Sequence, residues 1–269
     1  MQLADVNFKD LETVGFIVVP NFLTTELIEE ILLEYNTANA SHNKNYNVGS
    51  FIVNENLKKQ LSNTLAVIRN STNIQVDLVS ESGIYFDNSK VNFGWHQDHE
   101  TYFKWQDSYN SLNFWIPIVK PIHNKSGISI VPFDKFEKSF PNLSRREFIG
   151  QGAKRIWPKD NKTIIVDDER GTTYSLPINL DSIMVTPDLN PGDLVILRAD
   201  CIHRTQDSDT ARIGVSIHCE NGNNWLTREK FNSGSQHKKD MINKNIPGFK
   251  KIIDAFESND RIQVKDVFN

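Results

Sequence analysis

The sequence predicts a mainly β fold, an antiparallel sandwich or barrel, with helices before and after it. This prediction depends on three observations. Apolar residues recur at helical spacing before residue 76, short alternating or apolar runs fill residues 76–220, and polarity then rises until a last helical stretch near the end. Many short strands between turn residues are typical of such β architectures. No repeat or biased linker divides the 269 residues, so we expect a single domain, 1–269.

The N-terminal part, residues 1–75, is predicted to be a mostly helical support. Residues 15–20 are a β-branched run between breakers and predict a short strand. Thr24 or Thr25 is suited to cap the first helix, and a second helix is expected to begin near Asn54 or Asn56. The buried stripes of these helices would consist of Leu27, Ile28, Ile31, Leu32 and Tyr35, and of Leu57, Leu61, Leu65 and Ile68.

The β core is expected to span residues 76–220. Its predicted strands lie between clusters of Gly, Pro, Asn and Asp. The first predicted strand begins at residue 75, one residue before the stated start of the core. They cover 75–79, 83–86, 112–119, 127–132, 162–167, 172–178, 183–186, 194–197 and 212–219. The pair 162–167 and 172–178 resembles a hairpin that turns at residues 169–171.

The last part, residues 221–269, is predicted to be a helical extension. Residues 221–224 form a loop, and a final helix is expected to begin at Pro247, a residue suited to a first turn. This helix would bury Phe249, Ile252, Ile253 and Phe256. The lysines of this region are interpreted as a solvated helix face; they are Lys238, Lys239, Lys244, Lys250 and Lys251.

Composition excludes several classes of function. Thirty Lys and Arg against 34 Asp and Glu give a net charge of −4, so no basic field attracts nucleic acid or an anionic membrane. No apolar run is long enough to span a bilayer, and the N-terminus lacks the pattern of a signal peptide, so the expected location is the cytoplasm. Cys201 and Cys219 lie in strand-like runs and are expected to be buried free thiols without a chemical role.

The most specific local feature is the run from Gly94 to His99, which contains His96-Gln97-Asp98. On an extended segment residues i and i+2 point the same way, so His96 and Asp98 can present an imidazole and a carboxylate to one point. Taken alone, a His-x-Asp triplet is more often a hydrogen-bonding pair on the surface. His203 follows a Pro-Gly-Asp turn and a buried strand, and it supplies a third ligand from elsewhere in the fold. These residue types have the composition of a facial triad that leaves three positions of octahedral iron(II) open.

Arg212 heads a run in which alternate residues are polar. Period 2 sends Arg212, Gly214, Ser216 and His218 to one face of this strand and apolar residues to the other. A polar inner face suits a cavity that holds a dicarboxylate, because a guanidinium can bind a carboxylate through two parallel hydrogen bonds. The alternative is a surface arginine on an edge strand.

The chain resembles the phytanoyl-CoA dioxygenase-like branch of the iron(II)- and 2-oxoglutarate-dependent oxygenases. The resemblance covers nearly the whole chain and depends on the order and spacing of several pieces, among them 15–23, 95–98, 112–118, 125–132 and the Pro-Gly-Asp turn that leads to His203 and Arg212. It implies a double-stranded β-helix, a jelly-roll or cupin-like barrel flanked by helices. It also implies that His96, Asp98 and His203 hold iron(II), and that Arg212 binds the distal carboxylate of 2-oxoglutarate.

Two departures from the family pattern concern the cosubstrate and the loops. The run from Pro132 to Lys135 replaces a common Pro-Gly-Ser-His run, so we expect a reshaped loop there. Where many members carry a basic or amide residue before the metal motif, this chain has Tyr85 and its neighbours. Tyr85, and Asn113 on the next strand, are the candidate hydrogen-bond donors to the cosubstrate, although a strand Tyr is more often a packing residue.

The residues around the motif are expected to shape a substrate pocket. The candidates are Gln97, His99 and Trp115, with Tyr102, Phe103 and Trp105 in a loop over the mouth. This mixed aromatic and polar set suits a small polar molecule or a peptide side chain better than a long acyl chain. The alternative is that both tryptophans simply belong to the core.

The resemblance implies a dioxygenase that uses iron(II), 2-oxoglutarate and O2 to hydroxylate an unactivated carbon of a small polar metabolite, amino acid or natural-product intermediate, with release of succinate and CO2. The presence of Asp98 argues against the related halogenases, which have a small residue there. Two alternatives are a zinc-dependent hydrolase, although Gly94 stands where the first histidine of that motif belongs, and a non-catalytic jelly-roll binding protein. The composition favours no oligomeric state.

Overall fold

A computed structural model describes most of the chain. The described residues are 3–37, 48–80, 82–87, 93–98, 111–142, 154–167, 172–207, 209–232, 236, 239–240 and 249–268. No helix among them is long and apolar enough to cross a membrane.

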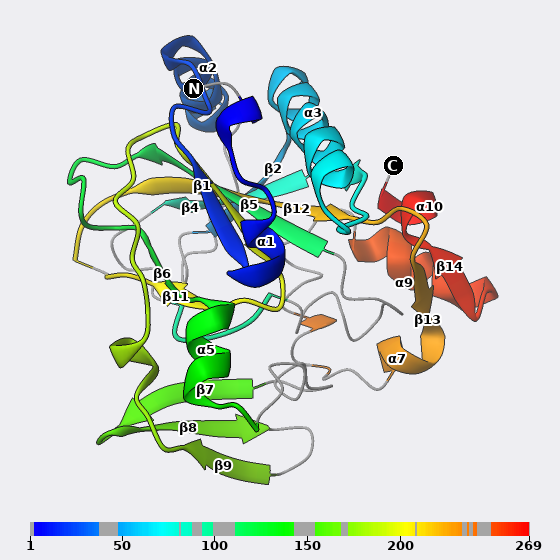
Figure 1. Cartoon of the computed structure of the whole chain (residues 1–269). Helices are drawn as coiled ribbons and strands as arrows, with labels where there is room; N and C mark the ends of the chain where they lie inside the picture. Colours follow the sequence, from blue (N-terminus) through cyan, green and yellow to red (C-terminus); the bar gives the residue numbers. More distant parts are fainter. Residues whose placement is uncertain are drawn as a thin grey trace.

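The centre of the fold is a seven-stranded antiparallel sheet (Figure 1). Its strands, in spatial order, are β1 (Phe16–Val19), β10 (Leu194–Arg198), β5 (Ser111–Val119), β12 (Ile213–Glu220), β4 (Ser82–Asp87) and β2 (Val48–Ile52), with β3 (Leu78–Val79) paired to β12. The first 75 residues therefore contribute two strands as well as helices. β1 was predicted from the sequence, whereas β2 was not.

Helices cover one face of this sheet. They are α2 (Thr25–Thr37) and α3 (Glu55–Ser71), which lie above the sheet in Figure 1. The predicted start of α3 is confirmed, because the Asn54 side chain accepts hydrogen bonds from the backbone N–H groups of Asn56 and Leu57. The predicted stripe from Leu57 to Ile68 is buried against the apolar residues of the sheet, among them Val215 and Ile217 of β12. Burial of this apolar stripe is the main interaction that stabilises α3 on the sheet.

The other face of the large sheet packs on a two-stranded sheet, β6 (Ile128–Val131) with β11 (Ile202–Thr205). Trp115, Val195 and Leu197 from the large sheet meet Ile128 and Ile130 of β6 in one buried cluster. The predicted mainly β fold with flanking helices is therefore confirmed. Among the described residues the strands do not close into a continuous hydrogen-bonded barrel.

A three-stranded sheet lies below this sandwich in Figure 1 and consists of β7 (Lys154–Lys159), β8 (Lys162–Asp167) and β9 (Thr172–Leu176). The predicted hairpin is confirmed by the pairing of β8 with β9, from Asp167 opposite Thr172, although its turn lies outside the described residues. β7 was not predicted. Of the run predicted as a strand at 183–186, the structure has only an isolated bridge between Val185 and Ile130.

The remaining elements are short, apart from the C-terminal helix α9. They are η1 (Leu3–Asp5), α1 (Asp10–Thr13), α5 (Phe133–Ser139), η3 (Leu180–Ser182), β13 (Trp225–Thr227), α7 (Arg228–Asn232), α9 (Phe249–Ser258), β14 (Arg261–Gln263) and α10 (Val264–Phe268). The predicted final helix is confirmed as α9, and its expected start at Pro247 lies outside the described residues. The C-terminal elements share their own apolar cluster, which includes Ile252 and Phe256.

The Pro-Gly-Asp turn joins the N-terminal segment to the large sheet. Gly192 has φ +84°, and a Cβ on it would lie 2.8 Å from Ile28 Cδ1 and 3.2 Å from the Leu23 carbonyl oxygen. The Leu23 N–H donates to the Gly192 carbonyl, and the Asp193 carboxylate accepts from the Asn21 N–H. The turn therefore requires glycine for both conformation and space.

We expect Gly192→Ala to lower the free energy of unfolding by at least about 1–2 kcal/mol, since a left-handed conformation is unfavourable for alanine and its methyl group overlaps α2. The measurement is urea unfolding. Gly94→Ala is the control, because nothing lies within 4 Å of a Cβ at Gly94, and it should change the stability by less than about 0.5 kcal/mol. Equal stabilities of the two variants would contradict this account of the turn.

Candidate metal centre

Backbone pairing brings the His-x-Asp segment beside the strand that carries His203. The N–H of His96 donates to the carbonyl of His203 at 2.9 Å, and the N–H of His203 donates to the carbonyl of His96 at 2.9 Å. Trp95, the residue before, forms a bridge to Ile156 of β7 and is buried. Residues 93–96 thus lie as an extended segment between β11 and β7.

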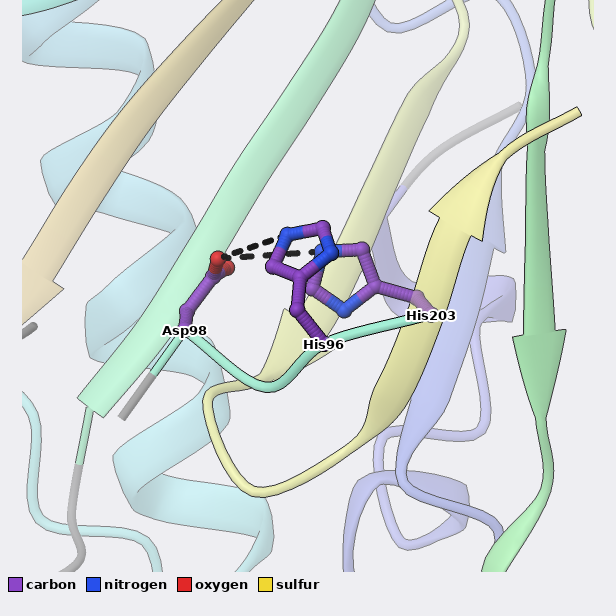
Figure 2. A group of neighbouring side chains, drawn as sticks. All are labelled: His96, Asp98 and His203. Carbon is purple, nitrogen blue, oxygen red and sulfur yellow. Dashed lines mark ion pairs between the residues drawn. The ribbon is translucent and has the colours of Figure 1, made fainter. Parts of the chain in front are cut away.

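Figure 2 shows His96, Asp98 and His203 pointing toward one another, with His203 coming from β11. The Asp98 Oδ1 atom lies 3.6 Å from His96 Nε2 and 3.7 Å from His203 Nε2. One ligand atom from each of the three residues lies within 4.8 Å of the others. The side chains of Asp98 and His203 are 12% and 7% exposed, whereas that of His96 is 30% exposed. The three residues proposed from the sequence therefore meet at one partly accessible point.

Hydrogen bonds to backbone carbonyls determine which nitrogen of each imidazole carries the proton. His96 Nδ1 lies 2.8 Å from the Gly94 carbonyl oxygen, and His203 Nδ1 lies 3.0 Å from that of Cys201. Because a carbonyl oxygen only accepts, each Nδ1 carries the proton, and in the neutral ring each Nε2 is left with a lone pair. Both lone pairs then face Asp98, which is the arrangement that a metal-binding histidine needs.

The charges at the site favour an ionised Asp98 carboxylate beside a neutral His203 imidazole. Burial raises the pKa of Asp98, but the attraction of the neighbouring histidines, His203 foremost, outweighs this effect and holds the pKa well below its usual range. Burial and the neighbouring His96 lower the pKa of His203 to about 4, in spite of Asp98. Near neutral pH, Asp98 and His203 therefore have the protonation states of metal ligands.

The residues present fit a metal ion. The distances between Nε2 and Oδ1 exceed the range of direct hydrogen bonds, yet they stay below roughly 4.2 Å, the largest separation that two atoms bound to one ion at about 2.1 Å each can have. Two imidazoles and one carboxylate, with one side of the group accessible, match the ligand set of non-haem iron sites that keep positions open.

Asn113 and Ser216 lie directly behind Asp98. Asn113 Nδ2 donates to Asp98 Oδ2 at 2.6 Å, and Ser216 Oγ donates to Asn113 Oδ1 at 2.7 Å. Asn113 was proposed from the sequence to bind the cosubstrate. The structure brings it to the candidate ligands His96, Asp98 and His203, called the metal group below. Ser216 was placed on the polar face of its strand by period 2, but a role for it was not predicted.

Arg212 is buried immediately before β12, two residues before Gly214. Its guanidinium donates from Nη1 to the Asp207 carbonyl oxygen at 3.1 Å. Burial lowers the pKa of Arg212, although the charge of Asp207 acts against this effect. A buried guanidinium is consistent with a carboxylate anchor and not with a surface arginine. Lys120, which no sequence pattern indicated, is a second buried cation, and it donates to the carbonyls of Ile122 and His123.

The prediction for Tyr85 requires correction. Tyr85 is opposite Val215 in the sheet, so its side chain lies on the helix-covered face with Val215 and Ile217 and not on the face that carries Ser216. It is 1% exposed, its ring packs on Tyr35 of α2, and its hydroxyl donates to the Ile31 carbonyl at 3.5 Å. Burial raises the pKa of Tyr85 well above its usual value. It is a packing residue of the core.

The proposed substrate residues have different surroundings. Gln97 is buried, and its Nε2 donates to the Asp200 carbonyl at 2.7 Å. Trp115 is 6% exposed and packs between the two sheets, where its ring is 3.2 Å from the position of a Cβ on Gly214. His99, Tyr102, Phe103 and Trp105 lie outside the described residues. Phe93, which no sequence pattern indicated, is 36% exposed with its ring centroid 6.1 Å from that of His96.

Comparisons with known proteins agree on the fold. No protein-family model matches the chain, and no curated protein matches it in sequence. Among solved structures, the non-haem α-ketoglutarate-dependent carbocyclase SnoK from nogalamycin biosynthesis superposes with a TM-score of 0.56 at 11% identity, covering 84% of this chain and 88% of its own. The corresponding epimerase SnoN gives 0.55 at 13% identity, with 87% and 85% covered.

EvdO2 from Micromonospora carbonacea var. aurantiaca, solved with 2-oxoglutarate, gives a TM-score of 0.53 at 11% identity, with 80% of this chain and 89% of that chain covered. The chain has the fold of these three proteins. The expected jelly-roll fold is therefore confirmed, with two facing sheets and helices outside them.

The contact of Gln97 with Asp200 predicts a structural effect. Gln97→Leu removes the donor and leaves a buried carbonyl oxygen without its partner, so the free energy of unfolding should fall by about 1–3 kcal/mol. The measurement is urea unfolding of the metal-free protein, with the exposed Gln236→Ala as control. If Gln97→Leu is as stable as the control, the hydrogen bond is unimportant and the substrate role regains weight.

Proposed function

We propose that the chain is a non-haem Fe(II)- and 2-oxoglutarate-dependent dioxygenase of the phytanoyl-CoA dioxygenase-like branch, with the whole chain as one catalytic domain. The observation that carries this proposal is the convergence of His96 Nε2, His203 Nε2 and Asp98 Oδ1 on one point in a shared oxygenase fold. Within the described residues, no contact favours either alternative, a zinc-dependent hydrolase or a non-catalytic binding protein.

In this proposal the residues of the site hold and orient the reactants. His96, Asp98 and His203 bind the iron, and Arg212 binds the distal carboxylate of 2-oxoglutarate through its buried guanidinium. When bound, iron and cosubstrate supply the oxidising power to hydroxylate an unactivated carbon, with release of succinate and CO2. The protein contributes geometry, charge and exclusion of water.

We propose that the substrate is a small polar metabolite, an amino acid or a natural-product intermediate. The structural neighbours support this class, since SnoN has been solved with Fe3+, α-ketoglutarate and nogalamycin RO. Within the described residues, Phe93 offers a half-exposed aromatic surface beside His96. Such a surface would pack against an apolar part of a substrate while polar groups orient it.

The first test is anaerobic titration of the metal-free protein with Fe(II) and then 2-oxoglutarate. We expect the visible charge-transfer band of a chelated keto acid to appear, because the site leaves positions open for the cosubstrate. The band should be lost in His96→Ala and in His203→Ala, while circular dichroism shows that the fold persists. Iron binding without the band would contradict the oxygenase proposal and favour zinc chemistry or a non-catalytic protein.

The role of Arg212 predicts a selective effect on the cosubstrate. Removal of a buried charged partner costs about 2–5 kcal/mol, so Arg212→Ala should raise the apparent Kd for 2-oxoglutarate about 30-fold or more. The affinity for Fe(II) alone should change far less, and Arg228→Ala, at a partly exposed arginine outside the candidate site, serves as control. An unchanged Kd for 2-oxoglutarate in Arg212→Ala would show that another residue is the anchor.

A further inference from the structure

We propose that Ser216 and Asn113 are positioning residues that hold Asp98 so that it offers one oxygen, Oδ1, to the metal ion. This inference rests on the proposed function, because it concerns the same metal group. It assigns roles beyond the three ligands: Ser216 orients Asn113, and Asn113 orients the carboxylate.

Strand pairing places Asn113 and Ser216 side by side on one face of the large sheet. Asn113 on β5 and Ser216 on β12 are 5% and 3% exposed, and they lie on the same face of two hydrogen-bonded strands. His218 is the residue opposite Asn113, and Ser216 is opposite Trp115, so Ser216 is a diagonal neighbour of Asn113. Diagonal neighbours on one face are close enough for side chains to touch. Two short hydrogen bonds, of 2.7 and 2.6 Å, then link Ser216, Asn113 and Asp98 in series.

The chemistry of the groups sets the direction of these bonds. An ionised carboxylate only accepts hydrogen bonds, so the NH2 group of Asn113 must face Asp98. The amide oxygen of Asn113 then faces Ser216, whose hydroxyl must donate to it. Without Ser216 the amide could turn and present its oxygen to the carboxylate, an arrangement that repels. A donor to an ionised acceptor makes one of the stronger hydrogen bonds in proteins, and burial strengthens the series.

The two oxygens of Asp98 therefore have separate surroundings. Oδ2 accepts from Asn113 at 2.6 Å, whereas Oδ1 lies 3.6 Å and 3.7 Å from the two Nε2 atoms. A carboxylate that turned both oxygens toward an ion would fill a fourth position. Three positions must stay open for the cosubstrate and dioxygen, so a fixed carboxylate serves the proposed function.

The test measures the Kd of the metal-free protein for Co(II), without cosubstrate, through quenching of tryptophan fluorescence. The variants are Ser216→Ala, Asn113→Ala and the double variant. Loss of a group that orients a ligand typically weakens metal affinity 10- to 100-fold. We expect such a loss in each single variant and little further loss in the double variant, because both substitutions break the same series. Ser216→Thr, which keeps the hydroxyl, should restore most of the affinity.

Ser129→Ala is the matched control, since Ser129 is also fully buried and hydrogen-bonds a side chain, Thr186, outside the metal group. It should leave the Kd for Co(II) within about twofold of the wild type, in line with an independent site. Circular dichroism and thermal melts of the metal-free variants establish that all are folded.

Each other outcome has a definite meaning. If the wild type binds no Co(II), the proposed function and this inference both fail. If it binds Co(II) but the single variants match Ser129→Ala, only the inference is overturned. If Asn113→Ala weakens 2-oxoglutarate binding and leaves the Kd for Co(II) unchanged, Asn113 contacts the cosubstrate and does not position Asp98. If the losses of Co(II) affinity in the two single variants add up in the double variant, Ser216 does not act through Asn113, and the inference is overturned.

Discussion

The pair of backbone hydrogen bonds between His96 and His203 is the constraint on which the candidate site depends. These residues are far apart in the sequence, and their side chains meet because the segment before Asp98 is paired with β11. The same pairing places Phe93 opposite Thr205, whose hydroxyl accepts from the Phe93 N–H. The ligands are thus held by main-chain geometry, which side-chain substitutions disturb little. Such rigidity is what a preorganised metal site requires.

The two faces of the large sheet differ in polarity because successive side chains of a strand point to opposite faces. On β12, Val215 and Ile217 join the helix-covered core, whereas Ser216 faces the metal group. The apolar face supplies stability and the polar face supplies chemistry. Because neighbouring strands carry the same alternation, Asn113 of β5 joins Ser216 on the polar face and Tyr85 of β4 joins Val215 on the other.

Much of the fold could be predicted because its signals are local. The stripe of α3, the cap at Asn54 and the apolar runs of β5 and β10 are visible in consecutive residues. β7 was missed because half of its six residues are charged and it contains Pro158, so it lacks the pattern of a buried strand. α5 was missed because its seven residues are too few to show a helical period.

The meeting of His96, Asp98 and His203 could be predicted because their residue types match a known set of metal ligands. The partners of Tyr85 and Gln97 could not, because they depend on register and on contacts between distant segments. Tyr85 needs the pairing of β4 with β12 to be assigned to a face, and the acceptor of Gln97 is 103 residues away. Side-chain roles within a strand become definite only when its neighbours are known.

The reciprocal backbone hydrogen bonds between His96 and His203 also couple the local opening of the two segments that carry these residues. A fluctuation that frees the amide of one residue must also free the carbonyl that it contacts on the other, so both should exchange their amide hydrogens as one cooperative unit. An ion bound to this group would then stabilise β11 and the segment before Asp98 together, since it binds only the closed form. Local opening of this edge of the sandwich would therefore release an ion bound to these ligands.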